Sequence, residues 1–116
     1  MTIETTIYTA LKGLVSGNVY DTRPPDTLSA TTYIVYQQVG GDSVNFLSSE
    51  VPSKRNGRFQ INTWAPTAHQ AAALARQVES AMRGINAYVF GDAVSTDDPD
   101  VGLFGRRQDF SLWSDY

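Results

Sequence analysis

Apolar residues near the N-terminus recur at steps of three and four positions, which is the spacing of an amphipathic helix. Thr2 precedes this stretch as a candidate N-cap, and Glu4 lies in the predicted first turn, where the helix dipole favours an anion. Gly17 can adopt the left-handed conformation that ends many helices. The apolar stripe of this first predicted helix consists of Ile3, Ile7, Ala10, Leu11, Leu14 and Val15.

Two segments in the first half of the chain have the pattern of β-strands. Residues 32–40 (TYIVYQQVG) are rich in β-branched and aromatic residues, and apolar groups on both faces predict a central strand. Residues 57–65 (GRFQINTWA) alternate instead, which predicts a strand with one face on the core. The residues predicted to face the core are Phe59, Ile61 and Thr63, and those predicted to face away are Arg58, Gln60, Asn62 and Trp64.

A second helix is predicted directly after this strand. Pro66 ends the strand because proline has no backbone N–H for the ladder, and Thr67 with Gln70 forms a capping box at the helix start. Gly84 is the predicted cap at the far end. The apolar stripe of this helix consists of Ala71, Leu74, Ala75, Val78, Ala81, Met82 and Ile85.

Two more strands are predicted in the last third of the chain, over residues 88–94 and 106–114, and the proline-containing segment 20–32 is predicted to be loop. In the last strand Phe110 and Leu112 face one side, and Ser111 and Trp113 face the other.

The order of these elements predicts the fold class. It reads helix, loop, strand, long loop, strand, helix, strand, strand, and it contains no internal repeat. We expect an α+β fold in a single domain over residues 1–116, with a mainly antiparallel sheet of about four strands and two helices packed on one face.

A loop of unusual length, about residues 40–56, connects the first two predicted strands. It carries Val44, Phe46 and Leu47, which a purely solvated loop does not favour. Either these side chains fold back as a small hydrophobic flap, or they contact another protein. Under the second interpretation they belong to a subunit or partner interface.

Composition excludes several classes of function. The chain of 116 residues has 12 acidic and 9 basic side chains, which disfavours a protein that grips nucleic acid with its whole surface. It has no cysteine and one histidine, which excludes disulfides and disfavours structural zinc. No apolar run reaches the length of a membrane span, and the N-terminal segment lacks the basic region of a secretory signal. We expect a protein made in the cytoplasm, with no cofactor and no membrane partner.

His69 is the residue on which an enzymatic function would depend. It is predicted in the first turn of the second helix, where the dipole lowers the pKa of a histidine and attracts anions. A hydrolase using His69 would need a nucleophile, and the chain has neither a cysteine nor a G-x-S-x-G elbow. A surface histidine in a capped turn is the favoured interpretation.

Charged residues gather in two further places. Asp97, Asp98 and Asp100 form an acidic turn, but no frame of the segment fits a calcium-binding EF-hand loop, so a solvated turn is favoured over a metal site. The basic residues would form one patch if the second and last strands pair. This candidate patch for phosphate or an acidic partner comprises Lys54, Arg55, Arg58, Arg106 and Arg107.

The two tryptophans both lie on the more polar faces of their strands. If those strands pair, Trp64 and Trp113 could make a cross-strand aromatic contact. Exposed tryptophans are also enriched at interfaces, because they bury a large area and keep a polar handle. We therefore take both as candidate interface residues, with coverage by the chain's own loops as the alternative.

With these elements in place, the chain resembles the tail-completion, or tail-terminator, proteins of long-tailed bacteriophages. The resemblance is carried by residues 6–15 (TIYTALKGLV), 33–41 (YIVYQQVGG), 57–82 (GRFQINTWAPTAHQAAALARQVESAM) and 100–114 (DVGLFGRRQDFSLWS). It spans nearly the whole chain in the family's order. One departure is visible, because the segment SATTY has no proline ahead of the first long strand, where the family often has one.

The resemblance implies a structural role in the virion. Such proteins form a ring, usually of six subunits, that docks on the head-proximal end of the tail tube, stops its growth and meets the head-completion proteins. The genome passes through the hole, and no catalytic residue is attached to the role. Asp97, Asp98 and Asp100 are candidates for the channel wall, where carboxylates would keep DNA from sticking. A head–tail connector or a tail-tube subunit of related fold is the alternative function.

Overall fold

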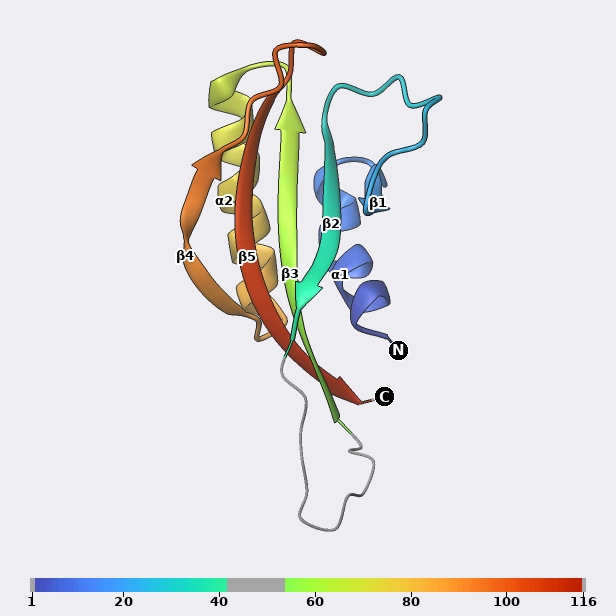
Figure 1. Ribbon diagram of the computed structural model, residues 1–116, viewed down its shortest axis with the longest axis vertical. Helices are drawn as coiled ribbons and strands as arrows, with labels where there is room; N and C mark the ends of the chain where they lie inside the picture. Colours follow the sequence, from blue (N-terminus) through green and yellow to red (C-terminus); the bar gives the residue numbers. More distant parts are fainter. Residues whose placement is uncertain (1, 42–53, 116) are drawn as a thin grey trace.

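The computed structural model describes residues 2–41 and 54–115, and Figure 1 shows how their helices and strands are arranged. The predicted order of the longer elements is confirmed, with one short strand in addition. In chain order the elements are α1 (Ile3–Leu11), the 3₁₀ helix η1 (Lys12–Leu14), β1 (Val19–Asp21), β2 (Tyr33–Gly40), β3 (Lys54–Ala65), α2 (Ala68–Gly84), β4 (Tyr88–Ser95) and β5 (Phe104–Asp115).

The strands form one five-stranded sheet in the order β1-β2-β3-β5-β4. β1 pairs with β2 in parallel, and the other three pairs are antiparallel. The prediction of a mainly antiparallel sheet is therefore confirmed, and the predicted number of about four strands is one too few. The missed strand, Val19–Asp21, is three residues long, which is too short to show a period, and Thr22 directly after it has a left-handed φ of 69°.

Both helices cover the same face of the sheet, as predicted, and no helix of the described residues lies over the opposite face (Figure 1). No helix among the described residues is long and apolar enough to cross a membrane. The predicted alternation of β3 is confirmed, because Phe59, Ile61 and Thr63 are buried on the helix side while Arg58 is exposed. The core is a layer of aliphatic and aromatic side chains between helices and sheet, and its fully buried large members are Phe59, Phe110, Ile3, Ile7, Leu11, Ile34, Ile61, Met82 and Val78.

The first helix begins as its sequence predicts and ends earlier. The backbone N–H of Thr5 donates to Oγ1 of Thr2 over 3.1 Å. The α-helix ends at Leu11 and η1 at Leu14, so Gly17, with a left-handed φ of 85°, lies beyond both helices. Glu4 ties this helix to the sheet, since Arg55 on β3 donates to both carboxylate oxygens over 2.9 and 3.3 Å. The same guanidinium donates to Oε1 of Gln38 on β2 over 2.7 Å. One arginine therefore joins α1, β2 and β3.

The ion pair between Glu4 and Arg55 gives the stability of the fold a dependence on pH. The hydrogen bond from Arg55 holds the pKa of Glu4 below its ordinary value of 4.5. A lowered folded-state pKa contributes stability that is present above about pH 4.5 and is lost as the pH falls through the folded value. Urea titrations measure how much unfolding free energy the protein loses between about pH 6 and about pH 3. We expect this loss to be smaller by about 0.5 kcal/mol in Glu4→Gln.

Removing the other partner is the matched experiment. Arg55→Ala should reduce the same acid-induced loss of unfolding free energy, because the two charges act as one pair. If both variants lose as much unfolding free energy on acidification as the unsubstituted protein does, this assignment is contradicted.

The second helix begins as predicted and ends differently. The backbone N–H of Gln70 donates to Oγ1 of Thr67 over 3.1 Å, which is half of the expected capping box. The prediction that Gly84 caps the helix is wrong, because Gly84 is its last residue and Asn86 takes the left-handed conformation, with a φ of 63°. Asparagine tolerates that region nearly as well as glycine. Asn86 and the following residue donate to the orphan carbonyls of Arg83 and Met82 over 3.0 Å each.

The loop predicted over about residues 40–56 is bounded by observed strands at Gly40 and Lys54. Its candidate interface residues Val44, Phe46 and Leu47 lie outside the described residues.

Candidate interaction surface

The position of His69 in the structure agrees with the surface histidine that the sequence favours. His69 is exposed in the first turn of α2, as predicted. Within the described residues its imidazole makes no side-chain hydrogen bond, whereas a catalytic histidine works with a nucleophile and an orienting group. The described part of the chain also contains no group of three or more histidine, aspartate or glutamate side chains that could hold a metal ion.

The acidic turn between β4 and β5 is ordered by its own carboxylates. Oδ1 of Asp97 accepts from the backbone N–H of Gly105 over 3.3 Å, and Oδ1 of Asp98 accepts from that of Asp100 over 3.0 Å. Asp98 also forms an isolated bridge with Leu103, closed by backbone hydrogen bonds of 3.0 and 3.3 Å. Two of the three carboxylates therefore shape the turn.

The five basic residues do not form one patch, although β3 and β5 do pair. Arg58 and Arg107 point to the open face of the sheet, whereas Arg55 and Arg106 point to the helix side. Arg55 pairs with Glu4, Arg58 pairs with Asp109 over 3.0 Å, and Arg106 donates to the hydroxyl of Ser95. Neighbouring positions of a strand face opposite sides, so sequence proximity did not make these charges neighbours in space.

The expected contact between the two tryptophans is also wrong. In the register of β3 and β5, Trp64 lies opposite Gly105 and Trp113 lies opposite Asn56, so the rings occupy opposite ends of the strand pair. Trp64 is half-buried and stacks on Tyr33, with ring centroids 6.4 Å apart. Trp113 is 55% exposed and offers a large apolar surface.

The open face of the sheet carries a compact polar and aromatic cluster beside β4. The guanidinium of Arg58 lies 4.3 Å from the ring centroid of Phe90 and forms an ion pair with Asp109. The ring of Tyr88 meets Phe90 edge-on, with centroids 5.0 Å apart. Tyr88 is 67% and Phe90 is 36% exposed, so the cluster presents aromatic surface to solvent. Such surface, rimmed by charge, is typical of a protein–protein contact.

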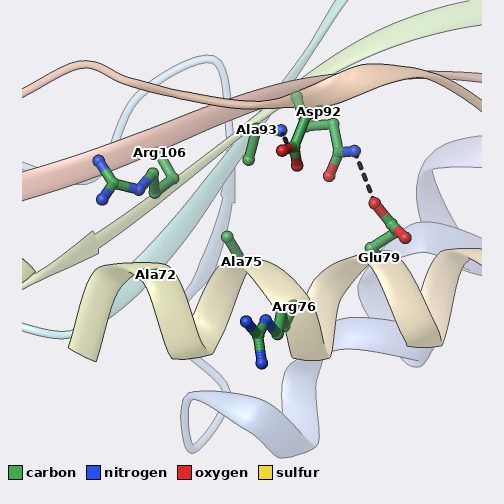
Figure 2. Close-up of a pocket in the computed structure, with 8 residues that line it drawn as sticks. Ala72, Ala75, Arg76, Glu79, Asp92, Ala93 and Arg106 are labelled. Carbon is green, nitrogen blue, oxygen red and sulfur yellow. Dashed lines mark hydrogen bonds between the residues drawn. The ribbon is translucent and has the colours of Figure 1, made fainter. Parts of the chain in front are cut away.

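A small polar cleft lies between α2 and the β4–β5 edge, and Figure 2 shows its lining. Gln108, buried on β5, donates from Nε2 to Oε1 of Glu79 over 2.8 Å and to the carbonyl of Gly91 over 2.9 Å. The hydrogen bond from Gln108, with a smaller contribution from Arg83, holds the pKa of Glu79 below its ordinary value. Arg76 and Asp92 also line the cleft.

This arrangement fastens the irregular part of β4 to α2. The register of β4 against β5 shifts between Phe90 and Val94, and Gly91 in that bulge has a φ of 64°. One amide, that of Gln108, bridges the bulge carbonyl and the helix carboxylate. Sequence reasoning missed Gln108, although its place on the core side of an alternating strand, two residues before Phe110, was a readable signal.

The fold is shared with known structures at low sequence identity. One is a chain of a structure described as the virion of a native gene transfer agent particle, at 16% identity and a TM-score of 0.57, covering 98% of this chain and 95% of that one. A second solved chain matches at 13% identity and a TM-score of 0.50, covering 100% and 97%. No curated protein matches the chain.

A family model settles the relationship. The model described as tail completion protein gp17 matches residues 6–115 of the chain. It therefore covers both helices except the start of α1, and all five strands. The chain belongs to this family of bacteriophage tail completion proteins, and its place is in the tail of the virion.

Proposed function

We propose that the protein forms a ring, of six copies, that caps the head-proximal end of the tail tube. The ring ends tube growth and joins the tail to the head connector, and the genome passes through its hole without sequence-specific binding. Its partners are other copies of the chain, the tail-tube protein and the head-completion protein. The observation that carries the proposal is the match of residues 6–115 to the tail completion family.

The open face of the sheet supports a role that depends on contacts and not on catalysis. Trp113 and the aromatic cluster at Tyr88 and Phe90 expose apolar area on the side that no helix covers. We assign Trp113, and the uncovered part of Trp64, to contacts with a subunit or partner. Val44, Phe46 and Leu47 remain candidates for the same kind of contact.

The acidic turn suits the wall of the channel. Asp97 and Asp100 are exposed, and Asp98 is half-buried beside them in the turn that joins β4 to β5 at one end of the sheet (Figure 1). Carboxylates there would repel the phosphates of the DNA and let it slide through the ring. Their hydrogen bonds within the turn hold two of the three charges in place.

Deleting the gene tests this function directly. In electron micrographs of lysates we expect tails longer than those of the normal phage, together with heads that carry no tail. Supplying the unsubstituted protein should restore tail length and joining, and His69→Ala should restore both equally well, because catalysis plays no part. Lysates without any tails would instead identify a tube subunit, and tails of normal length beside free heads would identify a connector.

A further inference from the structure

Among the described strands, the edge strand on one side of the sheet is β1, which leaves part of β2 uncovered, and the edge strand on the other side is β4. β1 covers β2 only from Ile34 to Tyr36, and the backbone N–H of Thr22 makes the last bond, to the carbonyl of Tyr36 over 2.8 Å. The following residues of β2, 37–40, are exposed and have no partner strand on that side among the described residues. At the opposite end of the strand order, β4 pairs with β5 alone.

The two open edges lie at the same height along the sheet. Reading the register across the strands, Tyr88 of β4 is in one row with Gly40 of β2, through Ser111 and Arg58. Phe90 is in one row with Gln37 of β2, through Asp109 and Gln60. The regular part of β4 that precedes its bulge is therefore level with the uncovered part of β2.

The directions of the two edges also match. The three antiparallel pairings between β2 and β4 make these two strands run in opposite directions, as the arrows in Figure 1 show. Rotating a copy of the chain about an axis along the strands preserves both height and direction. Residues 88–90 of one copy would then meet residues 37–40 of the next as an antiparallel pair, with three residues facing four because the register of β2 shifts between Gln38 and Gly40. The pairing would end at the bulge of β4, because Val94 and Ser95 are level with Val35 and Ile34, which β1 already covers.

Exposed apolar side chains lie at both edges at this height. Val39 is 46% exposed on β2, and Tyr88 and Phe90 are 67% and 36% exposed on β4. Neither stretch carries the proline or lysine with which many proteins block an edge strand. Backbone pairing and apolar contact would therefore form together.

We propose that β4 of one copy adds to residues 37–40 of β2 of the next copy, so that one sheet continues from subunit to subunit around the ring. The proposal rests on the ring proposed above and names the surfaces that build it. A second copy is the occupant because the chain itself supplies both halves, at one height and with the right polarity. A closed ring of this kind pairs the start of β4 and the uncovered end of β2 in every subunit, and leaves only the outer side of β1 and the end of β4 open.

Disulfide trapping tests the contact, since the natural chain has no cysteine. Under mild oxidation of rings or of tails that carry the protein, the double variant Val39→Cys with Tyr88→Cys should give a ladder of covalent oligomers up to the ring size. The double variant Gln37→Cys with Phe90→Cys tests the neighbouring row of the same contact. Each single variant should stay at monomer mass, because its cysteine faces no other cysteine.

A matched control uses an exposed residue away from both edges. Val101 is 61% exposed and lies beyond the end of β4. The control double variant Val101→Cys with Tyr88→Cys keeps the cysteine on β4 and moves the other one away from β2, so it should give no ladder. Ladders from this control as strong as those from the edge pairs would overturn the proposed geometry.

Charge substitution provides a second readout that does not depend on oxidation. Val39→Lys with Tyr88→Lys places like charges at every subunit contact and should lower the yield of closed rings about tenfold or more. Val39→Lys with Tyr88→Glu should recover most of that yield. Both residues are exposed, so the monomers should unfold as the unsubstituted protein does.

The outcomes separate this inference from the function on which it rests. Rings that form normally in the doubly lysine-substituted protein, with no ladder from either edge pair, would overturn the strand pairing and leave the tail-capping function intact. A protein that never appears at tail ends would overturn the ring and the strand pairing together.

Discussion

The Phe110→Ala variant is expected to lose about 3–5 kcal/mol of unfolding free energy, a large part of the roughly 5–15 kcal/mol that native domains have. Phe110 is fully buried on β5, opposite Phe59 in the register and level with Val89 of β4. It occupies the core between the paired strands and the helices. Truncation would remove its burial and leave a cavity that β-strands on both sides cannot close. Urea unfolding of the monomer, followed by tryptophan fluorescence, measures the loss.

Trp113→Ala is the matched control, because it removes an aromatic ring from the same strand, three residues further along. Trp113 faces away from the core and is 55% exposed. We expect its truncation to change the stability of the monomer by no more than about 0.5 kcal/mol. Equal losses from the two variants would mean that the open face of the sheet is covered within the monomer.

The Gly105→Ala variant is expected to destabilise the protein by about 1–3 kcal/mol, although it adds a single methyl group. A Cβ at this position would lie 2.6 Å from Oγ1 of Thr96, 2.9 Å from the ring of Trp64 and 3.0 Å from the carbonyl of Thr96. The close approach of Gly105 to Thr96 and Trp64 is thus possible only without a side chain. Thermal unfolding should show a lower midpoint and a changed environment of Trp64.

Gly84→Ala is the opposite case. At this last residue of α2 an added Cβ meets nothing within 4 Å. Alanine favours the helix over glycine, so we expect a gain of about 0.5–1 kcal/mol. If both glycine substitutions shifted stability in the same direction, the close approach at Gly105 would not be what determines its effect.

Local patterns predicted the elements whose stability is local. Each helix was predicted from a capping threonine and an apolar stripe, and Thr2 and Thr67 do cap the two helices at their N-termini. The core faces of β3 and β5 followed from alternation alone. These features depend on neighbours within a few residues, which is the range that a single sequence displays.

Features that depend on register could not be predicted in this way. Alternation shows which face a side chain takes but not which residue lies opposite, so Trp64 was expected near Trp113 and lies instead against Gly105. β1 forms only through a parallel pairing with β2, whose partner residues lie fifteen positions away in the chain, as in Val19 with Ile34. Its three residues carry no pattern of their own.

The candidate site was predictable to the same degree. The sequence indicated that Trp113 faces away from the core, and it disfavoured catalysis at His69. It did not reveal the grouping of Arg58 with Phe90 and Asp109, because those three side chains come from three different strands. A functional surface made across strands becomes visible only once the strand order is known.

If β4 pairs with a neighbouring copy as proposed, the bulge in β4 would limit how far the free chain associates before it reaches the tail tube. An uninterrupted edge of eight residues would invite stacking into open-ended fibrils. The shift between Phe90 and Val94, fastened by Gln108, confines the regular edge to its first three residues. A pairing that short is weak between free molecules and becomes strong only when a template raises their local concentration. The protein would therefore remain dispersed until tail tubes gather it.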